Sequence, residues 1–130
     1  MKIVVIIARI LLGAMMVFGG GMHLLNIGAK NPLPPGLAGE YVHVLMATGY
    51  MFVVGALELV PGILLLINRY VPLALTLLGP IVVNIFLAGA LVIRTPQGIA
   101  PGVVAAALWL LVFAQARSAF APLFKARAAA

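Results

Sequence analysis

Four long apolar stretches constrain the fold of this chain more than any other feature. They cover about residues 3–27, 50–67, 71–93 and 99–120, and short segments with Pro, Gly or a charged residue separate them. A helix rises about 1.5 Å per residue, so roughly 20 apolar residues cross a hydrocarbon core about 30 Å thick. The runs lack the two-residue alternation of a membrane barrel strand. We therefore predict an all-α integral membrane protein with four transmembrane helices in one domain, residues 1–130.

The composition agrees with this class and excludes several kinds of chemistry. Of the 130 residues, 65% are hydrophobic and only 8% are charged. In soluble domains about half of the residues are hydrophobic and about a quarter are charged. The net charge is +6, but the eight Lys and Arg are scattered singly and form no stripe, so we expect no nucleic-acid partner. The chain has no cysteine, which excludes disulfides and thiolate metal sites.

The connections between the runs predict the topology. The breaks at Arg69 and Arg94 are short, which favours an antiparallel up-down-up-down bundle with both termini on one side. That side would collect six cations, Lys2, Arg9, Arg69, Arg117, Lys125 and Arg127, and the opposite side would keep Lys30 and Arg94. The positive-inside rule then places both termini in the cytoplasm.

Two segments of the chain, the N-terminal run and residues 30–49, have more than one interpretation. Lys2 and the first apolar run resemble a signal peptide, but no small-x-small cleavage site precedes a mature domain, so we expect an uncleaved span. Residues 30–49 are predicted to form an outer Pro-rich loop, with an interfacial helix that begins near Glu40. The alternative is that residues 40–49 extend the second span into a long tilted helix.

Ionisable and amide side chains inside the spans are the candidate functional residues. Burying a charge there costs at least about 2.5 kcal/mol on insertion scales. Glu58 lies ten residues before Asn68, so it sits roughly 15 Å from that end of its helix. Arg9 and Asn84 belong to the first and third spans at compatible depths. The sequence therefore predicts a polar cluster of these residues, with Glu58 as the best catalytic candidate.

This cluster has two interpretations. It could bind a proton or form the polar floor of a quinone site, or it could simply fix the register of the bundle, since interhelical polar contacts are worth about 0.6 kcal/mol on average. Trp109 and Phe113, one turn apart in the fourth span, could stack on a flat ligand or pack in the core.

His23, Glu40 and His43 are the only weak candidates for a metal site. A three-ligand site or a haem held by the two histidines is conceivable, but the spacing matches no signature, and both histidines lie near water. We therefore expect no metal.

Two blocks of the sequence resemble the DoxX family of small four-helix membrane proteins of bacteria and archaea. The first is the Arg-x-x-x-Gly opening at Arg9–Gly13, which continues through residues 18–24. The second runs from Thr48-Gly49-Tyr50 to the Glu-x-x-x-Gly of Glu58–Gly62. The resemblance covers most of the chain and implies a cytoplasmic, or inner, membrane location. It places Arg9 and Glu58 on motif positions of the family.

The same resemblance implies a connection with quinones. Some relatives are membrane subunits of thiosulfate:quinone oxidoreductase, and others accompany redox systems. Relatives often have an aromatic-His pair shortly after the position of Asn84, where this chain reads Ile85-Phe86-Leu87-Ala88-Gly89. No role of that histidine is therefore carried over to this chain.

Three functions follow from these observations. The first is a redox-associated subunit that binds quinone or a similar apolar ligand, with electrons supplied by a partner. The second is a structural accessory subunit of a larger membrane complex, with a smooth Gly/Ala-rich face and no ligand cavity. The third is a proton-coupled transporter, which predicts a homodimer with a Glu from each copy in one chamber. Whether the chain is an enzyme stays open, because it has no self-contained catalytic motif. Expected partners are membrane lipids and either further copies of the chain or a larger complex.

Overall fold

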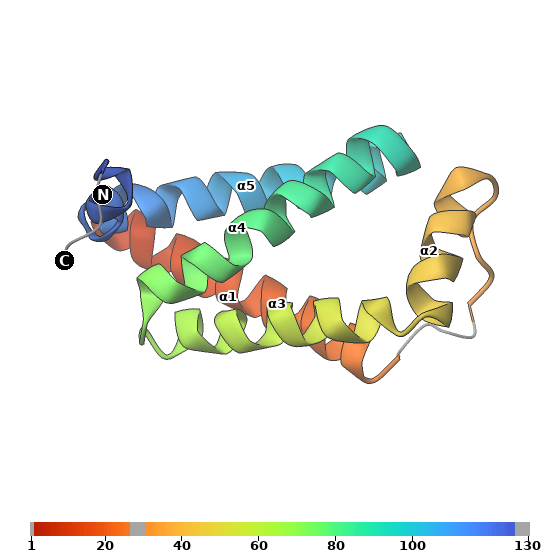
Figure 1. Ribbon diagram of the computed structural model, residues 1–130, viewed down its shortest axis with the longest axis horizontal. Helices are drawn as coiled ribbons and strands as arrows, with labels where there is room; N and C mark the ends of the chain where they lie inside the picture. The colour runs from red at the N-terminus through yellow and green to blue at the C-terminus, as the bar shows by residue number, and fades with distance from the viewer. Residues whose placement is uncertain (1, 27–30, 127–130) are drawn as a thin grey trace.

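The computed structural model describes residues 2–26 and 31–126, and the secondary structure of these residues is entirely helical (Figure 1). The elements are α1 (Lys2–Leu24), α2 (Leu37–Ala47), α3 (Tyr50–Leu66), α4 (Val71–Leu87), the π-helix η1 (Ala88–Ile93), α5 (Pro96–Ala116) and the 3-10 helix η2 (Arg117–Phe124). The end of the first predicted span, residue 27, and the start of the predicted outer loop, residue 30, lie outside the described residues.

Three of the helical segments are long and apolar enough to cross a membrane. They are Lys2–Leu24, Val71–Ile93 and Pro96–Phe124. The pair α2 and α3 passes the same criteria only when taken together, and it bends by 83° at the break between the two helices. Residues 2–26 and 31–126 therefore contain three candidate spans, or four if this bent pair is one span. Such a set of helices is that of a multi-pass membrane protein.

The surface of the helices supports the same conclusion. Many large apolar side chains are exposed, among them Ile3, Phe18, Leu25 and Leu110, each more than half exposed. Isolated exposed apolar residues are ordinary in soluble proteins, but contiguous apolar surfaces of this extent are not. Contact with lipid tails would keep these apolar side chains away from water.

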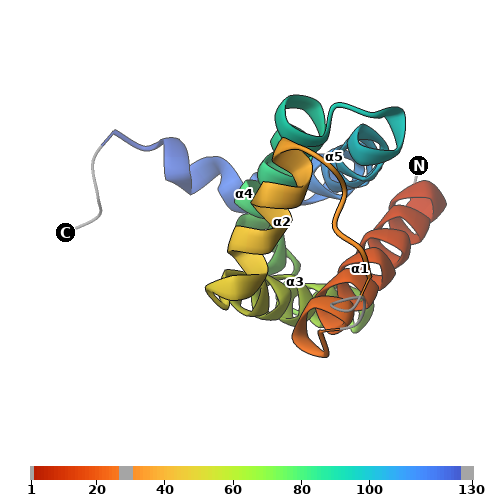
Figure 2. The same ribbon diagram turned by 90° about the vertical axis from the view of Figure 1, so that its right-hand side faces the viewer.

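Helices α1, α3, α4 and α5 lie beside one another, and each runs in the opposite direction to the one before it (Figure 1). In space they form a ring in which α1 contacts α3 and α5, and α4 contacts the same two helices. The start of α1 and the end of α5 lie at one end of the molecule (Figure 1). At the other end, α2 crosses from the start of α3 toward η1 (Figure 2).

Glycines bring α1 and α3 into backbone contact. A Cβ added to Gly13 would lie 3.0 Å from the carbonyl oxygen of Gly62, and one added to Gly20 would lie 2.6 Å from that of Gly55. Within each helix the two glycines are seven residues apart, so both lie on one face. Small residues at helix interfaces in membranes allow such close approach. Two matching glycine pairs thus align α1 and α3 in opposite directions.

The middle of the molecule is solidly packed. Leu12 and Met16 of α1, Leu65 of α3, and Leu75 and Leu78 of α4 are almost completely inaccessible. The partly buried Trp109 of α5 packs against them. Cavities are therefore found toward the two ends of the molecule, on either side of this core.

Candidate functional site

Glu58 is the only charged side chain that the described part of the chain buries. Its exposed fraction is 3%. It lies near the midpoint of α3, eight residues from each end, which is about 12 Å along the helix axis. Gly55 and Gly62, one turn before and one turn after it, belong to the face that meets α1. Glu58 therefore points into the interface between the two helices, where a Cβ added to Gly19 would lie 3.2 Å from its Oε2.

The partner of Glu58 is His23, near the end of α1. The distance between Glu58 Oε2 and His23 Nδ1 is 3.2 Å, and the imidazole remains about one third exposed. The contact has the distance of an ion pair, but the atoms lack hydrogen-bond alignment, so the buried Nδ1 has no hydrogen-bond partner. An acid and an imidazole placed in this way can both offer hydrogen bonds to a third molecule.

A cavity of about 310 Å³ opens beside this pair. Its polar lining includes Glu58, His23, Asn84 and Gln97, and its walls are mainly apolar, with Val54 and Ile85 among them. The lining residues come from every described α-helix and from η1.

Helix α2 forms one wall of the cavity through Tyr41, Val42 and Leu45. Gly36 and Gly49 flank this helix, and both have a positive φ, 73° and 76°. Glycine adopts this backbone conformation without steric cost. The sharp turn at Gly49 allows α2 to leave the axis of α3 and to cross the end of the molecule, as Figure 2 shows.

The predicted polar cluster divides into two parts. Asn84 lies in the cavity with Glu58, but Arg9 lies toward the other end of the molecule. The guanidinium Nη1 of Arg9 donates a hydrogen bond to the carbonyl oxygen of Leu65. Leu65 is seven residues, or about 10 Å of helix, beyond Glu58. Arg9 thus stabilises the C-terminal end of α3, where a cation is favourable, and is not the partner of Glu58.

Trp109 lines neither the cavity beside Glu58 nor the one that contains Arg9. Its Nε1 donates a hydrogen bond to the carbonyl oxygen of Leu75 at 3.0 Å. Its ring stacks on Phe113, with centroids 5.1 Å apart and an interplanar angle of 9°. The packing alternative, rather than ligand stacking, therefore describes Trp109 in this structure.

The weak metal candidates do not come together. His23 faces Glu58, whereas Glu40 and His43 are exposed on α2. Within residues 2–26 and 31–126, no group of three or more His, Cys, Asp or Glu residues could hold a metal ion.

Sequence reasoning missed the role of His23 beside Glu58 and the contributions of Tyr41, Tyr50 and Gln97 to the cavity. From the sequence, the tyrosines have the positions of an interfacial aromatic belt and Gln97 falls in an expected turn, whereas the structure places Gln97 in the first turn of α5. The placement of α2 across the end of the molecule adds Tyr41 to the site, while Tyr50 and Gln97 reach it from the first turns of α3 and α5.

Comparison with known proteins adds no constraint to this site. No family model, curated protein or solved structure matches the chain.

Proposed function

We propose that this chain is a DoxX-like membrane protein that binds quinone, or a similar apolar ligand with a polar head, in the cavity beside Glu58. In this proposal it serves as a redox-associated subunit of a larger membrane complex. The observation that carries the proposal is the pair formed by the buried Glu58 and the partly exposed His23, 3.2 Å apart, at the edge of a mainly apolar cavity. Ligand sites commonly have this character, with apolar walls, a few placed polar groups and roughly 300–1,000 Å³ of space.

The polar groups suit both redox states of a quinone. A quinone carbonyl only accepts hydrogen bonds, which an N–H of His23 or the amide of Asn84 can donate. A quinol hydroxyl also donates, and the carboxylate of Glu58 can accept from it. Because the sequence has no cysteine, electrons would come from a partner protein rather than from a thiol or a cysteine-bound cluster.

We also propose a definite membrane arrangement. Helices α1, α3, α4 with η1, and α5 span the cytoplasmic membrane of a bacterial or archaeal cell as an antiparallel bundle. Both termini lie in the cytoplasm, and α2 lies at the outer surface. The excess of Lys and Arg expected at the terminal end supports this orientation.

The cavity weighs against a purely structural accessory subunit. That function predicts no ligand cavity and a smooth glycine-rich face free for a partner. In this chain the glycines at positions 13, 20, 55 and 62 are used in the contact between α1 and α3.

The decisive experiment compares the small apolar molecules that co-purify with three proteins. The wild type, Glu58→Gln and Glu40→Gln would be purified natively, extracted and studied by mass spectrometry. Glu40 is the matched control, since it is the only other acid of the chain and is exposed on α2.

We expect a stoichiometric quinone in the wild type and in Glu40→Gln, and its loss in Glu58→Gln. If no form retains a quinone and a protein partner co-purifies instead, the accessory-subunit function replaces this proposal. A homodimer that exchanges protons across vesicles without retaining quinone would favour the transporter.

A further inference from the structure

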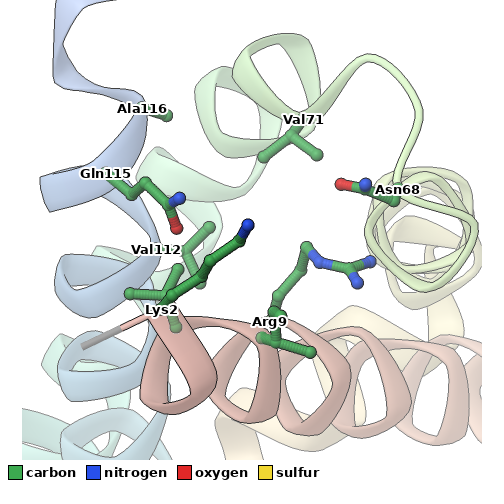
Figure 3. A pocket seen from close by; sticks show the side chains of 9 residues that line it. Lys2, Arg9, Asn68, Val71, Val112, Gln115 and Ala116 are labelled. Carbon is green, nitrogen blue, oxygen red and sulfur yellow. The ribbon is translucent and has the colours of Figure 1, made fainter.

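A second cavity lies at the opposite end of the molecule, where α1 begins and α5 ends (Figure 3). Its volume is about 340 Å³, and it shares no lining residue with the cavity beside Glu58. Lys2, Val5, Ile6 and Arg9 line it from α1. These positions are spaced by three, four and seven residues from Lys2, so they form one face of the helix.

The polar groups of this second cavity are cationic or neutral. Lys2 and Arg9 extend from α1 into the space, and the amides of Gln115 and Asn68 face it from α5 and from the turn after α3 (Figure 3). Arg9 uses an N–H for the carbonyl oxygen of Leu65. A guanidinium has five N–H donors, so others remain for a ligand.

No acid of the described chain neutralises these two cations. The whole sequence has two acidic residues, Glu40 and Glu58. Glu58 is buried against His23, and Glu40 lies on α2 at the far end of the molecule. A pocket with two cations, two amide donors and no carboxylate has the chemistry of a phosphate site.

The apolar part of the lining distinguishes between two sources of phosphate. Val5, Ile6, Val71 and Val112 form the walls below the charged groups. A further cavity of about 290 Å³ adjoins this one, because Lys2, Val5 and Gln115 line both. Free phosphate has no apolar part that could contact these walls, whereas a phospholipid presents a phosphate and acyl chains together.

We propose that this cavity binds the phosphate of an anionic phospholipid, with Lys2, Arg9 and Gln115 as its main ligands. Basic pockets between helices on the cytoplasmic side of a membrane recognise lipid headgroups in this way. The site is independent of the quinone proposal, because it lies beyond the packed core and uses other residues.

Native mass spectrometry of the detergent-purified protein tests the proposal. The protein would be titrated separately with phosphatidylglycerol, with zwitterionic phosphatidylethanolamine and with inorganic phosphate. The variants are Lys2→Gln and the matched control Lys125→Gln, which removes the same charge after η2, outside the cavity. Gln115→Leu removes the amide donor without changing charge. Arg9 is left intact because it also stabilises the end of α3.

We expect wild type to bind phosphatidylglycerol more tightly than phosphatidylethanolamine. A lysine near the membrane surface is worth about 1 kcal/mol toward an anionic lipid, so Lys2→Gln should weaken phosphatidylglycerol binding about fivefold. Lys125→Gln should bind as the wild type does, and Gln115→Leu should bind more weakly.

Three results would overturn the proposal. One is equal binding of the two lipids by the wild type. Another is an equal loss of affinity in Lys2→Gln and Lys125→Gln, which would indicate general surface charge. The third is displacement of the lipid by an equal concentration of inorganic phosphate, which would make this a site for free phosphate.

Discussion

The carboxylate of Glu58 reaches Nδ1 of His23 across the interface of α1 and α3, at 3.2 Å. The surrounding glycines make this contact possible. A Cβ added to Gly55 would lie 2.8 Å from the Cβ of His23, and one added to Gly19 would lie 3.2 Å from Glu58 Oε2. The absence of these side chains lets the two backbones approach, so that a short acid reaches a residue of the neighbouring helix.

The first prediction concerns the energy of this contact. We expect His23→Ala and Glu58→Ala to show a coupling free energy of about 0.6 kcal/mol in a double-mutant cycle, as for other interhelical polar contacts in membranes. Unfolding by titration with a denaturing detergent, followed by the fluorescence of Trp109, would measure it. A parallel cycle of His23→Ala with Glu40→Ala should be additive, because these residues lie on separate elements without contact. Additivity in both cycles would refute the Glu58–His23 contact.

The second prediction separates two adjacent glycines of α1. An added Cβ at Gly20 would lie 2.6 Å from the carbonyl oxygen of Gly55 and 2.7 Å from the amide nitrogen of Leu59, whereas nothing lies within 4 Å at Gly21. We expect Gly20→Ala to lower the free energy of unfolding by about 1–3 kcal/mol, because backbone atoms must move apart. Gly21→Ala should be neutral or stabilising, since alanine favours a helix by up to about 1 kcal/mol. Equal effects in a thermal unfolding experiment would show that α1 and α3 do not pack as described.

Apolar patterning predicts the helices of this chain better than it predicts their contacts. The sequence predicts the third run at residues 71–93, and α4 with η1 covers Val71–Ile93. It predicts the second run at residues 50–67, and α3 covers Tyr50–Leu66. These ends are sharp because Gly49, Tyr70 and Arg94 have positive φ values at the turns, which stops a helix locally.

The partner of Glu58 could not be predicted from the same pattern. Counting residues along a helix gives the position of a side chain along the helix axis, and Glu58 lies eight residues from each end of α3. It does not give the rotation of the helix or the direction of a long side chain. Arg9 could reach several groups, and the structure directs it to the carbonyl oxygen of Leu65. The wall formed by α2 depends on the 83° bend after it, which a hydropathy pattern does not contain.

The third prediction tests whether Trp109 binds the ligand. Trp109→Phe removes the hydrogen bond to the carbonyl oxygen of Leu75 but keeps an aromatic ring beside Phe113. We expect a loss of about 0.5–1.5 kcal/mol in the free energy of unfolding, measured by circular dichroism. Quinone retention should equal that of the wild type, because Trp109 does not line the cavity. Loss of quinone in a folded Trp109→Phe protein would contradict this placement.

The fourth prediction compares two arginine side chains that donate to backbone carbonyl oxygens. Arg9 bridges from α1 to Leu65 of α3, whereas Arg94 bonds through Nε to Leu91, three residues earlier, at the exposed end of η1. We expect Arg9→Leu to lower the free energy of unfolding by about 1 kcal/mol, since it removes a cation from a helix C-terminus and an interhelical bond. Arg94→Leu should change it by less than about 0.5 kcal/mol, as exposed substitutions do. Both variants should retain quinone as the wild type does. A loss of quinone in Arg9→Leu but not in Arg94→Leu would indicate that Arg9 belongs to the Glu58 site.

The fifth prediction concerns orientation, and the composition of the chain makes it simple to test. Because the sequence has no cysteine, Lys125→Cys and Arg94→Cys each provide one thiol on a background without any. These positions follow η2 and η1, which lie at opposite ends of the molecule (Figure 1). With both termini in the cytoplasm, a membrane-impermeant maleimide should label Arg94→Cys in right-side-out vesicles and Lys125→Cys only in inverted ones. The reverse pattern would invert the proposed topology and place the basic cavity at the outer surface. Labelling of both variants from one side would contradict a membrane span in α5, because only α5 and η2 lie between Arg94 and Lys125.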